Sequence, residues 1–118
     1  MIVEVEDILI DTLKQLGFPV HLQGSLADNE DYPPTFFTFW NNDSEGTAHY
    51  DNKEHAIVYD YDVNIYSSNQ EYVYSKLREA IEKLRKKGFI ISGDGYSVIS
   101  DEPTHDGRGV NVLYIKRR

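Results

Sequence analysis

The segment HAIVYDYDVNIYS, residues His55–Ser67, alternates its side chains with the period of a β-strand. One face of this strand would carry only apolar and aromatic residues: Ile57, Tyr59, Tyr61, Val63 and Ile65. The opposite face would carry Asp60 and Asp62 together with Val58, Asn64 and Tyr66. We therefore predict a strand with one face on a core, whose acidic face meets water, a metal, a substrate or another protein chain.

Two amphipathic helices are predicted, one before and one after this strand. Apolar residues recur at helical spacing from about Val3 to Gln15, and Gly17 is placed to end this helix. Ser68 and Glu71 form a capping box that predicts the start of the second helix. That helix has an apolar stripe, ends at Gly88, and carries four basic residues in its last turns, where they suit the negative end of the helix dipole: Lys83, Arg85, Lys86 and Lys87.

The other strands follow from short aromatic or β-branched runs. TFFTFW, residues 35–40, is aromatic on both faces of its pleat, and its Phe36 and Trp40 side fits either a core or a contact surface. Residues 41–54 are polar and rich in turn formers, which predicts the tip of a hairpin that joins this strand to His55–Ser67. The remainder of the chain predicts two or three short strands, the last two of them paired across a loop rich in Gly, Pro and Asp.

The order helix, hairpin, helix, hairpin predicts an α+β fold. We expect a mainly antiparallel sheet of about four or five strands, with both helices packed on one face and with Asp60 and Asp62 on the other. A chain of 118 residues favours a single domain, residues 1–118. Its hydrophobic fraction of 40% and aromatic fraction of 13% are too high for a disordered chain, even with a net charge of −8.

Composition excludes several classes of function. The chain has no cysteine, so a disulfide, a thiol nucleophile and a thiolate metal site are ruled out. A pI near 4.8 disfavours general nucleic-acid binding. No apolar run approaches the roughly 20 residues that span a bilayer, and acidic residues stand near the N-terminus where a secretion signal has basic ones. We therefore expect a protein that folds in a cytoplasm and does not bind membranes.

The charge is divided unevenly along the chain. Residues 1–62 contain 13 acidic residues and 2 lysines, a charge of −11, whereas residues 63–118 contain 7 acidic and 10 basic residues, a charge of +3. Two halves of opposite charge favour head-to-tail contacts between copies. Such contacts produce a ring or a filament, not a two-fold dimer.

Two clusters contain residue types that occur in catalytic or metal sites. His49, Asp51 and His55 have side chains that bind zinc or iron, but their spacing matches no metal motif and they lie in the expected hairpin tip. Asp60 and Asp62 would project from one face about 7 Å apart, a separation compatible with glycosidic or two-metal chemistry. No third catalytic group accompanies them, so we favour a solvated face or a face that meets a basic partner.

Two further motifs favour structural interpretations. The GDG at residues 93–95 lacks the Lys and Ser/Thr of a phosphate loop and predicts a turn or bulge. His105 and Asp106, with Asp101 nearby, resemble parts of a hydrolase triad, but no serine has the context of a nucleophile elbow. We therefore expect no enzyme activity, no cofactor and no bound metal.

Charge alone suggests which residues form a contact between copies. We predict that Asp60 and Asp62, with Glu45 on the neighbouring hairpin, meet a basic surface of the next copy. Two basic clusters qualify, one at the end of the second helix and one at the chain end: Lys83, Arg85, Lys86 and Lys87, and Lys116, Arg117 and Arg118. Neither is interleaved with aromatic residues, so we do not expect sequence-specific nucleic-acid binding.

The order of these signals resembles a known class of proteins. A leading amphipathic helix, an aromatic strand, a polar hairpin, the phrases DYDVNIYS and LRKKGF, and a closing strand pair that ends in YIKRR are similar to small tail-terminator or tail-completion proteins of long-tailed bacteriophages and prophages. The likeness covers nearly the whole chain, and related neck and minor capsid proteins share the same size and element order.

This resemblance implies a structural role in the virion. Such proteins commonly form a hexameric ring on the head-proximal end of the tail tube, stop its growth and present a surface to the connector of the capsid. It implies self-association, tail-tube and head–tail connector proteins as partners, and assembly in the bacterial cytoplasm. It implies no enzyme activity, no cofactor and no catalytic residues to transfer.

Two alternatives belong to other classes of function. An acidic adaptor or inhibitor would bind one basic protein through the acidic half of the chain and would be monomeric alone. A small enzyme built on the His- and Asp-rich loops would need a tightly bound metal or a shifted pKa at His49, His55 or His105.

Overall fold

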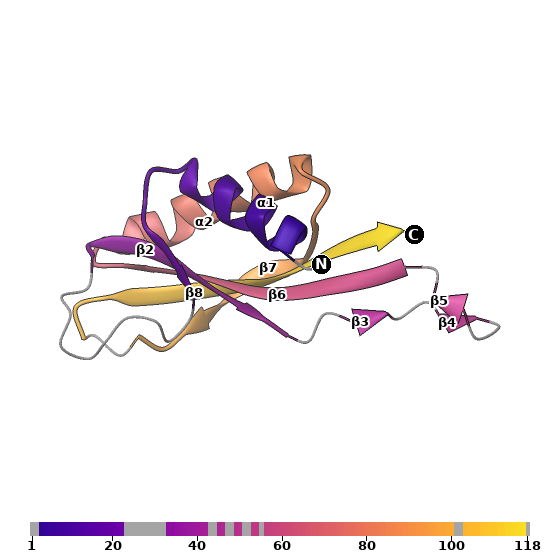
Figure 1. Ribbon diagram of the computed structural model, residues 1–118. Coiled ribbons are helices and arrows are strands. Elements are labelled where there is room, and N and C mark those ends of the chain that lie inside the picture. Colours follow the sequence, from indigo (N-terminus) through magenta and orange to yellow (C-terminus); the bar gives the residue numbers. More distant parts are fainter. Residues whose placement is uncertain are drawn as a thin grey trace.

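Two helices lie on one face of a mostly antiparallel sheet (Figure 1), so the predicted α+β fold is confirmed. The computed structural model describes residues 3–22, 33–42, 45–46, 49–50, 53–54, 56–100 and 103–117. Its elements are α1 (Val3–Lys14), β1 (Val20–Leu22), β2 (Thr35–Asn41), β3 (Glu45–Gly46), β4 (His49–Tyr50), β5 (Lys53–Glu54), β6 (Ala56–Ser67), α2 (Gln70–Lys86), β7 (Ile90–Val98) and β8 (Asp106–Arg117).

β6 is the central strand of a six-stranded sheet with the order β1-β2-β6-β8-β7, and β3 also pairs with β6. β2 and β8 both run antiparallel to β6, with Phe37 opposite Ile65 and Val63 opposite Val110. The predicted pairing of the TFFTFW strand with His55–Ser67 is thus confirmed. The short strands β1 and β3 were not predicted, and β1 runs parallel to β2. β4 and β5 form a separate two-stranded sheet.

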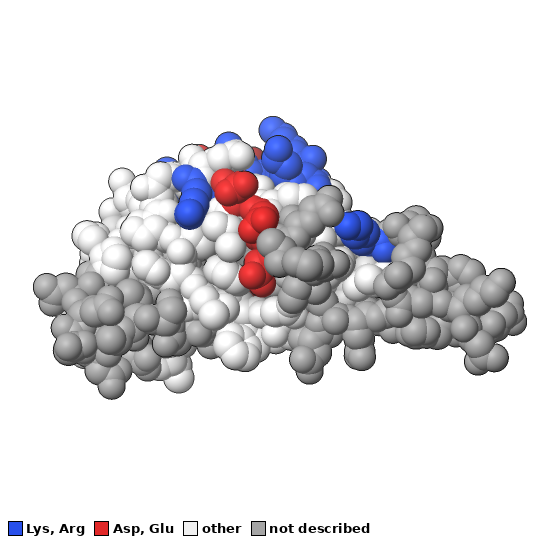
Figure 2. Space-filling view, in the orientation of Figure 1, with Lys and Arg blue, Asp and Glu red and all other residues white. Residues whose placement is uncertain are grey.

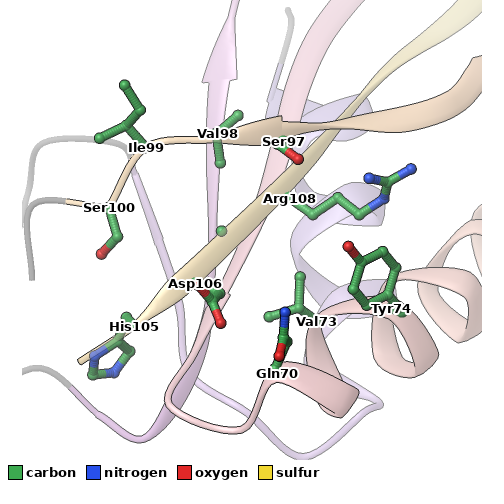
Figure 3. A pocket seen from close by; sticks show the side chains of 11 residues that line it. Gln70, Val73, Tyr74, Ser97, Val98, Ile99, Ser100, His105, Asp106 and Arg108 are labelled. Carbon is green, nitrogen blue, oxygen red and sulfur yellow. The ribbon is translucent and has the colours of Figure 1, made fainter. Parts of the chain in front are cut away.

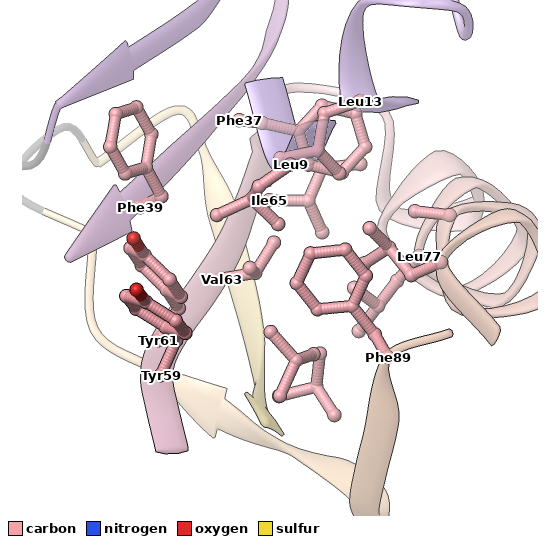
Figure 4. Packing of buried hydrophobic residues seen from close by; sticks show 14 of the residues in the cluster. Leu9, Leu13, Phe37, Phe39, Tyr59, Tyr61, Val63, Ile65, Leu77 and Phe89 are labelled. Atoms are coloured by element: carbon pink, nitrogen blue, oxygen red, sulfur yellow. The ribbon is translucent and has the colours of Figure 1, made fainter. Parts of the chain in front are cut away.

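The core lies between the sheet and the two helices (Figure 4). The predicted apolar face of β6 supplies its centre, because Tyr59, Tyr61, Val63 and Ile65 are all at most 2% exposed. The helices and the neighbouring strands cover these four with further buried side chains: Val5, Leu9, Leu13, Phe37, Phe39, Val73, Leu77, Ala80, Leu84, Phe89, Val110 and Val112. The apolar face of β6 and the apolar faces of α1 and α2 therefore pack together in one core.

The hydroxyl group of Tyr61 is enclosed in this core. The Tyr61 side chain is fully buried, and its hydroxyl has no partner of good hydrogen-bond geometry among the described residues, although the Glu6 carboxylate interacts with it. Burial raises the pKa of Tyr61 far above its ordinary value, and the negative charge of Glu6 raises it further.

α2 begins one residue later than the predicted capping box implies. Its N-cap is Asn69, whose side chain accepts a hydrogen bond from the backbone N–H of Glu71. The prediction of Ser68 as the cap is wrong because the backbone N–H of Ser68 donates to the carbonyl of Pro34, which keeps it in the β2–β6 pairing. The predicted end at Gly88 is confirmed, with φ of 99°. None of the helices in the described part of the chain is long and apolar enough to cross a membrane.

The GDG motif lies in an irregularity of β7. The register between β7 and β8 shifts between Ser92 and Tyr96, so this segment is the predicted bulge. Gly93 and Gly95 have φ of 77° and 101°, a region that residues with a Cβ rarely adopt.

Candidate functional site

The face of the sheet opposite the helices is the candidate site and is named here the outer face. Directly opposed residues of antiparallel strands project to the same face, so the register gives its members. They are Phe36, Thr38 and Trp40 of β2, Val58, Asp60, Asp62, Asn64 and Tyr66 of β6, Gly107, Gly109, Asn111, Leu113 and Ile115 of β8, and Ile90, Ser92, Tyr96 and Val98 of β7. The prediction that Asp60 and Asp62 face away from the helices is confirmed.

Asn111 links the two carboxylates at the centre of the outer face. Its Nδ2 atom donates to Oδ1 of Asp60 at 2.5 Å and to Oδ1 of Asp62 at 3.2 Å. Asn42 Nδ2 adds a longer hydrogen bond of 3.3 Å to the same oxygen of Asp60. These donors are neutral amides, so they orient the carboxylates without cancelling their negative charge.

The negative charge of the acidic pair affects the pKa of Tyr96, which belongs to the neighbouring strand β7. Burial raises the pKa of the Tyr96 phenol, and the charges of Asp62 and then Asp60 raise it further. No Lys or Arg among the described side chains projects from the outer face. The centre of this face is therefore a fixed pair of negative charges without a cationic partner in the described part of the chain.

Large apolar side chains surround the acidic pair and remain exposed. Trp40 is 48% exposed, Tyr96 44%, Ile90 48% and Ile115 41%. All four belong to the outer face, where Trp40 is opposite Asp62 and Ile90 is opposite Leu113. Exposed apolar groups gathered on one face are typical of a protein-binding surface.

The two aromatic residues of β2 on this face have different surroundings. Phe36 is 2% exposed because it stacks on Tyr66 at 5.3 Å between ring centroids and also contacts the rings of His105 and His21. Trp40 remains half exposed. The sequence did not decide whether this side is core or contact surface. In the structure, Phe36 belongs to a buried cluster and Trp40 to the exposed surface.

Two glycines of β8, Gly107 and Gly109, let side chains of the neighbouring strands pack against the backbone of β8. A Cβ at Gly107 would be 2.7 Å from the ring of Tyr66, and a Cβ at Gly109 would overlap Oδ1 of Asn64. The same Cβ at Gly109 would be 3.1 Å from the ring of Tyr96. A side chain at either position would therefore displace Tyr66, Asn64 or Tyr96 on the outer face.

The predicted basic residues lie on the helix side of the sheet. Lys83, Arg85 and Lys86 belong to the last turn of α2, and Lys87 is its C-cap. Figure 2 shows Lys and Arg side chains grouped over this end of the molecule, and the Asp and Glu side chains visible in this view lie over α1, on the same side of the sheet. Asp60 and Asp62 and the basic end of α2 thus lie on opposite faces of the sheet.

The structure gives only strand positions for most of the other predicted interface residues. Lys116 pairs with Ile57, a residue packed against the core, so it belongs to the helix side. Glu45 pairs with Val58 and therefore occupies a position on the outer face. Arg117 pairs with Ala56, and Arg118 is outside the described residues.

The described residues include only part of the clusters considered as metal or catalytic sites. His49 lies in β4, while Asp51, His55 and Asp101 are outside the described part of the chain. The ring of His105 bonds to the carbonyl of Pro33 at 2.8 Å. Within the described ranges, no group of three His, Cys, Asp or Glu residues could hold a metal ion.

Sequence reasoning missed the partners that complete the acidic centre. Asn111 was not singled out, although it is the one amide in the apolar run VNVLYI of β8. A polar residue at an alternating position of such a strand is a signal that the strand pairs with another polar position. Tyr96 carried no comparable signal, because the bulge at Gly93–Gly95 sets the face to which it points.

No protein-family model matches the chain. No curated protein is significantly similar to it.

Proposed function

We propose that this protein is a structural component of a bacteriophage or prophage particle, of the tail-terminator or head–tail joining type. Copies join head to tail into a ring at the end of the tail tube, and the ring connects the tube to the connector of the capsid. The ring is hexameric, as the resemblance implies. Assembly takes place in the bacterial cytoplasm, and the role requires no enzymatic reaction and no cofactor.

The observation that carries this proposal is the separation of opposite charges by the sheet. Asp60 and Asp62 form an acidic centre on the outer face, and Lys86 and Lys87 are exposed at the end of α2 on the helix side. A two-fold dimer through the outer face would bring the acidic pairs of both copies together. A heterologous contact instead brings the acidic centre of one copy to the basic helix end of the next, and such contacts close into a ring when the rotation between copies allows it.

Apolar contacts would supply affinity beside these charges. Trp40, Tyr96, Ile90 and Ile115 surround the acidic centre, and each loses exposed apolar area when another protein covers the face. Apolar burial stabilises an interface by about 25 cal/mol per Å². The charges then set the orientation of the copies, because exposed charge pairs contribute more to specificity than to affinity.

Light scattering after size exclusion tests self-association over a protein concentration series at low and moderate salt. We expect a species several times the mass of the 13.6 kDa chain, and we expect salt to weaken it because screening shortens the reach of exposed charges. Asp60→Lys with Asp62→Lys should reduce the mass to that of a monomer. Lys86→Glu with Lys87→Glu should do the same.

A mixture of these two double variants is the decisive control. In an alternating ring, the reversed face of one variant meets the reversed helix end of the other, so all contacts are complementary again. We expect the mixture to recover the assembly that each variant alone has lost. Loss of assembly in both variants without recovery on mixing would contradict the proposed contact, and an unchanged mass in Asp60→Lys with Asp62→Lys would also contradict it.

The lack of a described cation on the outer face also favours a second candidate, an acidic adaptor or inhibitor that binds one basic protein. Its prediction differs, because the chain alone would be monomeric at every concentration and salt. Pull-down with purified tail-tube and connector proteins then separates assembly that the tail tube triggers from adaptor binding to an unrelated basic protein.

A further inference from the structure

A hollowed groove lies between α2 and the β7–β8 hairpin, on the helix side of the sheet and away from the acidic centre. It consists of two adjoining hollows of about 280 and 290 Å³, and both are lined by Tyr74 and Arg108. In the first hollow, Figure 3 shows Arg108 and Tyr74 at one end and His105 and Ser100 at the other. The second hollow continues along α2 to Arg85.

Three arginines make the second hollow positively charged. Arg78, Arg85 and Arg108 all line it, and none of its described side chains is acidic. Arg108 is held in place, because its Nη2 atom donates to the carbonyl of Gly95 at 3.3 Å and its guanidinium lies 5.1 Å from the ring centroid of Tyr74. Positioned guanidinium groups are the usual protein partners of carboxylates.

Apolar side chains form the other part of the groove lining. Leu77 and Ile81 line the hollow that contains the three arginines, and Val73 lines the adjoining one. Val73 and Leu77 are each 2% exposed and belong to the core, so Ile81 and Tyr74 are the apolar groups of α2 that a ligand in the hollows can contact. Asp106 lines the first hollow, so the negative charges of a matching ligand fit the second hollow, beside these apolar groups.

The length of the groove indicates an extended ligand. α2 rises about 1.5 Å per residue, so the lining from Gln70 to Arg85 extends over about 22 Å, the length of about six or seven residues of extended chain. β7 is the outermost strand on this side of the sheet among the described strands, so its outer edge can pair with an added strand. A small anion would contact only part of this surface.

We propose that this groove docks an extended acidic segment of a partner protein, with apolar side chains on Tyr74 and Ile81 and carboxylates on the three arginines. A nucleic acid fits less well, because the net charge of −8 repels a long polyanion. The proposal goes beyond self-association, since it concerns another surface and another partner.

Fluorescence anisotropy with a labelled heptapeptide, Glu-Leu-Glu-Val-Glu-Leu-Glu, tests the proposal on the full chain. We expect saturable binding that Arg78→Glu with Arg85→Glu weakens about tenfold or more, equivalent to about 1.4 kcal/mol. Lys86→Glu with Lys87→Glu is the matched control, because it changes the net charge equally at the end of the same helix but lies outside the groove lining. Circular dichroism confirms that both variants are folded.

The controls decide between specific docking and general attraction. Equal weakening by both double variants, equal binding of the lysine version of the peptide, or absence of binding would overturn the proposal. Equal binding of a version with Ser in place of Leu and Val would overturn the apolar contact, and equal competition by a short single-stranded DNA would overturn selectivity for a protein segment. Peptide binding that survives in the Lys86 and Lys87 variant after loss of self-association would show that the two surfaces act separately.

Discussion

Replacement of Asn111 by Asp is the most direct test of how the acidic centre is held. Asn111→Asp keeps the shape of the side chain but replaces an amide that donates to Asp60 and Asp62 by a third carboxylate. Two hydrogen bonds to charged acceptors are lost, and two like-charge contacts appear at distances of about 3 Å in their place. We expect the variant to be less stable at pH 7.

The magnitude follows from the half-buried position of the carboxylates. Like charges at about 4 Å repel by about 1 kcal/mol each in bulk water, and a hydrogen bond to a charged group contributes about 1.5–3 kcal/mol when it is shielded. With a discount for exposure to solvent, the free energy of unfolding should fall by about 2–4 kcal/mol. For a domain of this size, the Tm should fall by roughly 8–16 °C.

Urea denaturation at pH 7 and pH 3 measures the effect and its cause. The deficit should shrink at pH 3, because strong acid neutralises carboxylates and so removes the repulsion. Ser92→Asp is the matched control, since it adds the same charge in the same cross-strand row but on an exposed neighbour of Asn111, and it should cost less than about 0.5 kcal/mol. A full-strength deficit at pH 3, or none at pH 7, would refute the assignment of Asn111.

Three further changes test other parts of the fold. Tyr61→Phe removes a buried hydroxyl without a partner of good hydrogen-bond geometry among the described residues, so urea unfolding at pH 7 should show equal stability or a gain of about 1 kcal/mol. Because the raised pKa of Tyr61 keeps the phenol protonated in the folded state, wild type should lose stability from about pH 10 upward, and the variant should lose less. Gly109→Ala should lower the Tm, with a loss of about 2 kcal/mol, because its Cβ would overlap Asn64. Asn69→Ala should cost about 1 kcal/mol in urea unfolding, whereas Asn69→Asp should keep the N-cap and most of the stability.

Only part of the candidate site could be predicted from the sequence. Alternation in β6 predicts that Asp60 and Asp62 share a face, because successive side chains of a strand point to opposite sides. The donor that bridges them comes from Asn111 on β8, and only the strand register brings it to them. The same holds for Trp40, which the register of β2 places opposite Asp62.

Errors at the boundaries of elements also come from tertiary contacts. Ser68 and Glu71 satisfy the pattern of a capping box, but the hydrogen bond from Ser68 to Pro34 extends the strand pairing and moves the cap to Asn69. The three-residue strand β1 is too short to show a period, and it is a strand only because β2 lies beside it.

The sequence by itself determined the α+β class, the two helices and the face of β6 that is buried. It could do so because apolar burial has no direction and requires only that apolar residues recur with the period of their own element. The tertiary structure decided which polar groups meet: Asn111 with the acidic pair, and Arg78, Arg85 and Arg108 in one groove. Hydrogen bonds and ion pairs act only at short range and in fixed directions, so they depend on strand register and on the packing of α2 against the sheet.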